Sequence, residues 1–330
     1  MRRNQGKTYN VSSFSIGLVS LCLLFTVHSS LFLAGCATQA KMQRLKEASA
    51  HYKLGISYLN DQMTQQAFVE FQKAVEQNPD DRDSHYALGH IYFLQQKYEE
   101  AEKRFKTALK LDKDYSEAHN YLGKVYEQRG RIDAAIREYQ MALKNPTYST
   151  PDIGRYNLGV AFQTKGERDE AIREFQQAVL INPDHLLAYY ALAQLYAKSG
   201  KFDEATSSYK EVLRLFPESA EARYQLAWVY LKSNAKAQAV SEFGTLVERS
   251  PDSDLAKRSK KHLAFLQSKQ EKLRPGMTSD QVMKVLGKSD PVVRRGGSVV
   301  GEEQWFLNIY DLVLRFENGR YKGYQESTRE

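Results

Sequence analysis

Small, large and aromatic apolar residues return every 34 positions between residues 48 and 251. In the second of six copies, Leu88, Gly89 and Tyr92 lie at positions i, i+1 and i+4, and Ala101 and Phe105 follow at i and i+4. These spacings place each set on one face of an α-helix. The pattern therefore predicts two amphipathic helices in each copy, joined by a short turn.

Proline closes most copies of the pattern. Because proline cannot continue a helix, it marks the end of the second helix of a copy. One pair of helices is too small to bury its own apolar faces, so neighbouring copies must stack and bury them jointly. The closing residues are Pro79, Lys113 (in place of proline), Pro146, Pro183, Pro217 and Pro251.

This period and this order of residues resemble the tetratricopeptide repeat. The resemblance implies a mainly α fold in which residues 48–251 form a right-handed superhelical solenoid with a concave inner surface. Residues 252–271 then carry Ala256, Leu263 and Leu266 on one side and several lysines on the other. This distribution predicts a helix that caps the last repeat.

The chain begins with basic, then apolar, then small residues, an order typical of a secretory signal. Arg2, Arg3 and Lys7 precede the mostly apolar run 14–32, which leads into Leu33-Ala34-Gly35-Cys36. That ending resembles the lipobox of bacterial lipoproteins, which implies cleavage before the cysteine and a covalent lipid on its sulfur. The alternative is an uncleaved membrane anchor helix, against which the short apolar run counts.

Ala37 and Thr38 follow Cys36, without the aspartate that marks retention at the inner membrane. By the same resemblance, we expect a lipid-anchored protein of the outer membrane that faces the periplasm. Cys22 would leave with the signal and Cys36 would be acylated, so no thiol would remain for a disulfide, a metal or a nucleophile. Losing the signal's three basic residues lowers the net charge from +7 to +4, which with export argues against nucleic acid as a partner.

The sequence contains no motif that indicates catalysis: no nucleophile elbow, no paired-histidine metal motif and no phosphate-binding loop. We therefore expect no enzymatic activity, no cofactor apart from the lipid and no small-molecule substrate. His51, His85 and His119 lie one period apart. Even neighbouring helices are about 8–10 Å apart, so these histidines cannot share one metal ion, and a packing role is expected.

The fifth residue of each copy is a candidate binding residue, because tetratricopeptide-repeat proteins usually hold ligands along their inner helices. Tyrosine occupies this place in five of six copies, and tyrosine offers a large contact area with a polar end. We expect a groove for an extended or helical segment of a partner protein; the alternative is that these side chains pack helix against helix. The candidates are Tyr52, Tyr86, Asn120, Tyr156, Tyr190 and Tyr224, together with Phe93 and Trp228.

The repeat pattern is absent after residue 272. Thr278 and Gln281 have the spacing of a capping box before a short helix. Residues 288–301 are expected to form a loop that exposes Arg294 and Arg295 to lipid head groups or an acidic partner. Strands are predicted over 304–310, 312–316 and 320–324, the last two joined by the hairpin turn Asn318-Gly319.

Several short motifs in this region resemble the SmpA/OmlA family, which includes the small lipoprotein subunit of the outer-membrane β-barrel assembly machine. The resemblance implies a small α+β domain that contacts envelope proteins. The chain departs from the family in its longer gap before Pro291. Trp305 is expected in the core of the small sheet. The motifs are Gly276-Met277-Thr278, Gln281-Val282, Leu286-Gly287, Pro291, Trp305 and Phe316-Glu317-Asn318-Gly319.

Two interaction modules behind a lipid anchor suggest a scaffold for outer-membrane protein or envelope-complex assembly. A pilotin-like lipoprotein for the type IV pilus secretin and an adaptor for peptidoglycan enzymes are the alternatives. The expected division of the chain is a signal peptide (1–35), a tether (36–47), six repeats (48–251), a capping helix (252–271) and an α+β domain (272–330).

Overall fold

A computed structural model describes residues 38–269, 272–286, 292–296, 302–307, 310 and 312–326. Cys36 and the predicted signal peptide lie outside the described residues. The chain divides into two compact units, Met1–Tyr148 and Ser149–Glu330. Among the described helices, none has both the length and the apolar content needed to cross a membrane.

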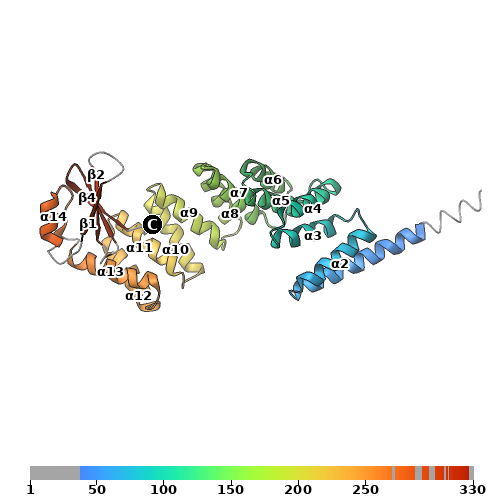
Figure 1. Cartoon of the computed structure of the whole chain (residues 1–330), viewed down its shortest axis with the longest axis horizontal. Coiled ribbons are helices and arrows are strands. Elements are labelled where there is room, and N and C mark those ends of the chain that lie inside the picture. Colours follow the sequence, from blue (N-terminus) through green and yellow to red (C-terminus); the bar gives the residue numbers. More distant parts are fainter. Residues whose placement is uncertain are drawn as a thin grey trace, which may run out of the picture. The chain divides into compact units, whose positions relative to one another are not determined.

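The described part of the first unit is entirely helical, as the repeat pattern predicts (Figure 1). Each repeat contributes two antiparallel helices. The chain is helical from residue 38 to 60, and then come α2 (Thr64–Gln77), α3 (Arg82–Leu94), α4 (Tyr98–Leu111), α5 (Ser116–Gln128) and α6 (Ile132–Lys144).

The second unit continues the helical repeats and ends in a small sheet, so the predicted fold class is confirmed. Its helices are α7 (Pro151–Lys165), α8 (Arg168–Ile181), α9 (Leu186–Lys198), α10 (Phe202–Leu215), α11 (Ala220–Lys232), α12 (Lys236–Arg249), α13 (Asp254–Ser268) and α14 (Ser279–Leu286). Its strands are β1 (Val292–Gly296), β2 (Glu302–Leu307), β3 (Leu312–Glu317) and β4 (Arg320–Glu326).

Residues 38–60 form one helix, so the described part of the predicted tether, 38–47, is helical and continuous with the first helix of the repeats. This stretch contains neither proline nor glycine before Gly55, and lysine, glutamine, methionine and leucine all favour helix. Gln43 donates a hydrogen bond to Glu47 one turn later at 2.9 Å. The 34-residue pattern starts later than the helix that carries it, so the pattern alone placed the boundary too late.

Close contact between the two helices of a repeat depends on the small residue after the repeat leucine. A Cβ atom built on Gly89 would lie 2.7 Å from the Phe105 ring, and one on Gly123 would lie 2.6 Å from the Tyr139 ring. Both aromatic side chains are fully buried. The glycine thus leaves the space that the aromatic ring of the second helix fills.

In five of the six repeats, a second link joins residues 19 positions apart. Both ring nitrogens of His119 face acceptors: Nδ1 lies 2.7 Å from the Glu138 carboxylate, and Nε2 donates to the Lys113 carbonyl at 2.9 Å. The equivalent histidines therefore tie helices together within their own repeats. The same spacing joins His51 to Glu70, His85 to Arg104, Arg155 to Glu174 and Arg223 to Glu242.

The carboxy-terminal sheet is antiparallel with strand order β1-β2-β3-β4. Part of the loop predicted over 288–301 is a strand: β1 pairs with β2 and places Arg294 opposite Trp305 and Arg295 opposite Gln304. The sequence Val-Val-Arg-Arg-Gly lacks a clear alternation of apolar and polar residues, and its strand conformation depends on this long-range pairing. The contact role of the two arginines stays a prediction.

Local signals in this region correspond to the observed structure. The capping box is formed, since the Thr278 amide donates to Gln281 at 2.8 Å and the Gln281 amide donates to the Thr278 hydroxyl at 3.3 Å. Asn318 and Gly319 both have positive φ angles, of 50° and 73°, as a tight hairpin turn requires. Trp305 is fully buried, which confirms its place in the core of the sheet.

One apolar cluster connects the sixth repeat, α13 and the sheet. Phe243 of α12, Phe265 of α13 and Trp305 of β2 belong to it, and each is completely buried. In Figure 1 the sheet and α14 lie beside α13. The carboxy-terminal module therefore shares a core with the helix that caps the repeats.

Candidate functional site

The candidate binding residues lie on the first helices of the repeats: 38–60, α3 and α5 in the first unit, and α7, α9 and α11 in the second. The contacts of these side chains separate those that face an open surface from those that are packed inside. Each unit is described by itself.

In the first unit, aromatic side chains of α3 and α5 gather around Tyr121. The Tyr121 ring centroid lies 5.8 Å from that of Tyr86, 4.8 Å from His90 and 5.8 Å from Phe93. The ammonium group of Lys124 lies 5.1 Å from the Tyr121 ring and 5.6 Å from the Phe93 ring. Two predicted residues thus belong to an aromatic cluster completed by Tyr121 and His90, which the fifth-position rule does not select.

The tyrosine and histidine side chains of this aromatic cluster of α3 and α5 favour their uncharged forms. Burial raises the pKa of the Tyr86 and Tyr121 hydroxyls. Burial, with a smaller effect of Lys124, lowers the pKa of His90. Lys124 is then the cluster's cation, held against two rings where a cation is favoured. Such a surface suits apolar or aromatic side chains of a partner.

Two further predicted residues of the first unit contribute less open surface. Tyr52 is half-buried, and its ring lies 5.6 Å from Phe71 of the same repeat. Asn120 is only 5% exposed. Its side chain lies in the packed interior of α5, so it does not line a groove.

In the second unit, α7 and α9 enclose a groove of about 410 Å³. Tyr156 and Tyr190, both predicted from the repeat pattern, lie on its two sides. The remaining lining side chains carry no charge and combine amides with apolar groups. We call this the α7–α9 groove; it is lined by Tyr156, Val160, Gln163, Thr164, Leu187, Tyr190, Ala191 and Gln194.

The chemistry of the α7–α9 groove fits a polypeptide segment. Side-chain amides such as those of Gln163 and Gln194 can both donate and accept hydrogen bonds, which matches the backbone of an extended chain. Leu187 is 55% exposed, so it offers apolar contact without being needed inside the fold. Both tyrosines rest on rings of their own repeats, with Tyr156 5.6 Å from Phe175 and Tyr190 6.0 Å from Tyr209.

Tyr224 does not face an open surface, contrary to the prediction, and Trp228 is largely buried but lines a groove between α11 and β4. Tyr224 is 1% exposed and Trp228 is 6% exposed. The Tyr224 hydroxyl lies 2.8 Å from Nε2 of His262 on α13, and the Trp228 ring lies 5.2 Å from the same imidazole. The capping helix covers the first helix of the sixth repeat, and it buries the residues that are equivalent to groove residues elsewhere.

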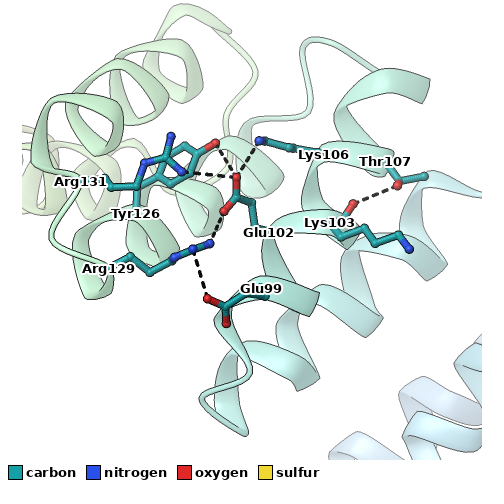
Figure 2. A network of polar contacts seen from close by, with 8 residues as sticks. All are labelled: Glu99, Glu102, Lys103, Lys106, Thr107, Tyr126, Arg129 and Arg131. Carbon is teal, nitrogen blue, oxygen red and sulfur yellow. Dashed lines mark hydrogen bonds and ion pairs between the residues drawn. The ribbon is translucent and has the colours of Figure 1, made fainter.

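A charged network lies on α4 and the turn after α5 (Figure 2). Glu102 is its centre: its carboxylate lies 2.6 Å from Lys106 and 2.5 Å from Arg129, and it accepts a hydrogen bond from the Tyr126 hydroxyl at 3.3 Å. Burial alone would raise the pKa of Glu102, but these partners outweigh it and lower that pKa. Because Arg129 also reaches Glu99 at 3.1 Å, the network ties the second repeat to the third.

Models of the tetratricopeptide repeat match the chain in both units. A model described as TPR repeat matches residues 89–128, and models described as tetratricopeptide repeat match 58–107, 153–218 and 197–263. No curated protein sequence matches the chain.

Solved structures with the same helical arrangement include bacterial proteins. PilF of Pseudomonas aeruginosa has a TM-score of 0.58 and 21% identity, over 66% of this chain and 98% of PilF. PilW, described as a widely conserved type IV pilus biogenesis factor, has a TM-score of 0.56 and 20% identity, over 64% and 96%. YrrB, described as a TPR protein with an unusual peptide-binding site, has a TM-score of 0.50 and 25% identity, over 58% and 97%.

Proposed function

Because the chain is built on a solenoid of tetratricopeptide repeats, we propose that it is a non-enzymatic scaffold whose α7–α9 groove binds an extended segment of a partner protein. The observation that carries this proposal is the uncharged groove of about 410 Å³ between two inner helices. Tyrosine rings, side-chain amides and one exposed leucine line it. These groups match the backbone and apolar side chains of a peptide better than they match a metabolite.

The aromatic cluster of α3 and α5 would provide a second contact on the same partner chain or on another one. Its half-exposed rings and the Lys124 ammonium group favour an apolar or aromatic segment. Because recognition by repeat proteins is spread along extended surfaces, two separate patches of this kind would add to affinity.

The partner we propose is a protein of the bacterial envelope. The lipobox ending at Cys36 favours a protein anchored by lipid to the outer membrane and facing the periplasm. The fold similarity to PilF and PilW, the latter described as a type IV pilus biogenesis factor, favours the secretin of that pilus as the partner. The pilotin-like role is therefore our first proposal, before the roles in β-barrel assembly and as an adaptor for peptidoglycan enzymes.

A second candidate is a subunit or client of the β-barrel assembly machinery. It rests on the motifs of residues 272–330 that resemble the SmpA/OmlA family, and on a small domain in which a helix, α14, precedes an antiparallel sheet. A role as adaptor for peptidoglycan enzymes is the third alternative.

A matched pair of variants tests the groove. Leu187 lies in the α7–α9 groove and is 55% exposed, whereas Leu180 on α8 is 72% exposed and does not line it. L187D and L180D therefore place the same charge on the surface of neighbouring helices without disturbing the core. We expect L187D to lose partner capture from mildly solubilised outer membranes, and L180D to retain it.

The identity of the captured protein separates the alternatives. Recovery of the secretin with the unaltered protein and with L180D, but not with L187D, would support the pilotin-like role. Recovery of barrel-assembly subunits or peptidoglycan enzymes in the same pattern would support the corresponding alternative. Equal capture by both variants would show that the groove does not bind the partner.

A further inference from the structure

A second groove lies in the carboxy-terminal part of the second unit, between α11 and β4. Its volume is about 600 Å³. One wall is the surface of α11 and the turn that follows, and the other is β4; Leu273 and Pro275 also line the groove. We call it the α11–β4 groove; it is lined by Gln225, Trp228, Leu231, Lys232, Asn234, Leu273, Pro275 and the five consecutive residues Tyr321, Lys322, Gly323, Tyr324 and Gln325.

The lining shows that the groove faces the edge of the sheet. Side chains of consecutive strand residues point alternately to opposite faces, apart from a β-bulge at Lys322. A cavity that all five consecutive residues line therefore borders the edge of their strand and not one face of the sheet. The strand order places β4 last in the described sheet, paired with β3 on its other side. The groove is therefore bounded by the free edge of β4.

The chain already uses the start of this edge for pairing. The Tyr321 amide donates to the Met277 carbonyl at 2.8 Å, and the Gly276 amide donates to the Tyr321 carbonyl at 2.8 Å. Thr278 and Arg320 form an isolated antiparallel bridge. Among the residues that the structure describes, none pairs with this edge past Tyr321, and residues 322–325 border the groove instead. At about 3.3 Å per residue, this free edge is roughly 13 Å long, enough for a strand of four residues.

The charged side chains that line the groove indicate which kind of polypeptide it binds. Lys232 and Lys322 are its charged lining residues, and no carboxylate lines it. Lys322 is held by Glu317 at 2.9 Å. Among the described residues, no carboxylate lies within ion-pair distance of Lys232, so this cation on the α11 wall is available to a ligand.

We propose that the α11–β4 groove binds an extended, acidic segment of a partner polypeptide as an added strand on the edge of β4. Backbone hydrogen bonds to residues 322–325 would supply the pairing, and a carboxylate of the segment would meet Lys232. Leu231 on the α11 wall would contact an apolar side chain on the other face of the added strand. Because α11 forms the opposite side of the groove beside this edge, a single strand fits there better than the whole sheet of a second folded copy.

This proposal goes beyond the function proposed above and does not depend on the lipid anchor or on the pilus. It places a second polypeptide site in the same unit as the α7–α9 groove, on different residues. Failure of one site would therefore leave the other testable.

The probe is an array of acetylated and amidated octapeptides in which Val and Thr alternate and Asp replaces none, one or two residues. Binding is measured in detergent to the unaltered full chain, to K232E and to K210E. The last is the control, because it reverses the charge of an exposed lysine of α10 outside the groove. We expect the Asp-bearing peptides to bind the unaltered protein and K210E equally, and K232E about tenfold more weakly. Peptides with Lys in place of Asp should regain binding to K232E.

Hydrogen exchange identifies the mode of binding. An added strand should slow amide exchange within residues 322–326, and L187D should leave this effect unchanged. The proposal is overturned if none of the peptides binds, if K232E binds as well as K210E, or if the protection lies elsewhere. A dimer in sedimentation that protects the same amides without peptide would also overturn it, because a second copy would then be the occupant.

Discussion

Replacing Tyr224 with alanine should loosen the end of the repeats, because this side chain supports the capping helix. It is 1% exposed, packs against Phe243 with ring centroids 5.6 Å apart, and hydrogen-bonds His262 of α13 at 2.8 Å. Removing a fully buried aromatic side chain costs about 3–5 kcal/mol. Y224F removes only the hydroxyl and should cost about 1 kcal/mol.

Hydrogen exchange is the suitable assay, because repeat proteins lose terminal repeats without unfolding completely. A loss of 3–5 kcal/mol corresponds to exchange that is faster by about two to three and a half orders of magnitude. We expect this acceleration in α11 and α13 of Y224A, and a change of about fivefold in Y224F. Tyr156 is only half-buried, so Y156A should change exchange in α7 far less. If α13 exchanges at the same rate in Y224A as in the unaltered protein, the capping contact described above is wrong.

Three further predictions follow from the packing, the histidines and the lipobox. Burial alone would lower the pKa of His119, but the hydrogen bond to Glu138 and smaller favourable interactions together outweigh burial and raise that pKa. The stability that His119 adds relative to H119Q should therefore be largest below pH 6.5 and disappear as the pH rises through the raised pKa. Burial lowers the pKa of His85, so the stability that His85 adds relative to H85Q should be full above pH 6.5 and decline as the pH falls. Thermal unfolding of the unaltered protein and both variants from pH 5 to 8 measures these differences. If the melting temperatures of the three proteins change with pH in parallel, the directions of the two pKa shifts are wrong. In G123A the new Cβ would lie 2.6 Å from the Tyr139 ring, which should cost about 1–3 kcal/mol and lower the melting temperature; an unchanged value would show that the ring moves freely. Mass spectrometry of the protein extracted from membranes should find a chain that begins at Cys36 and carries the added mass of the lipid, whereas an unlipidated chain that keeps residues 1–35 would favour an uncleaved anchor helix.

The repeat architecture could be predicted because its signals are local and occur six times. Leu88, Gly89 and Phe105 have fixed spacings that are determined by the geometry of two packed helices. The link between residues 19 positions apart was equally present in the sequence, as His119 with Glu138 and Arg223 with Glu242. Such a link becomes visible only when two positions of one repeat are compared, whereas the 34-residue pattern relates one position across all repeats.

The features that could not be predicted depend on long-range packing. The fifth-position rule treats all repeats alike, but Tyr224 is covered by α13, and nothing in its own repeat indicates this. Asn120 is buried although Tyr52, Tyr86, Tyr156 and Tyr190 at the equivalent position are partly open. The strand β1 has weak local preference and forms because β2 lies beside it. The edge of β4 became a candidate site only when the sheet order and the position of α11 were known.

Site-specific photo-crosslinking from the α7–α9 groove tests the central claim most directly. A benzophenone side chain replaces Leu187 in the groove or Leu180 on α8, and outer membranes that contain either protein are irradiated. We expect one principal adduct with an envelope protein, the type IV pilus secretin, from position 187 and none from position 180. Equal adducts from both positions, or no adduct from position 187, would contradict it.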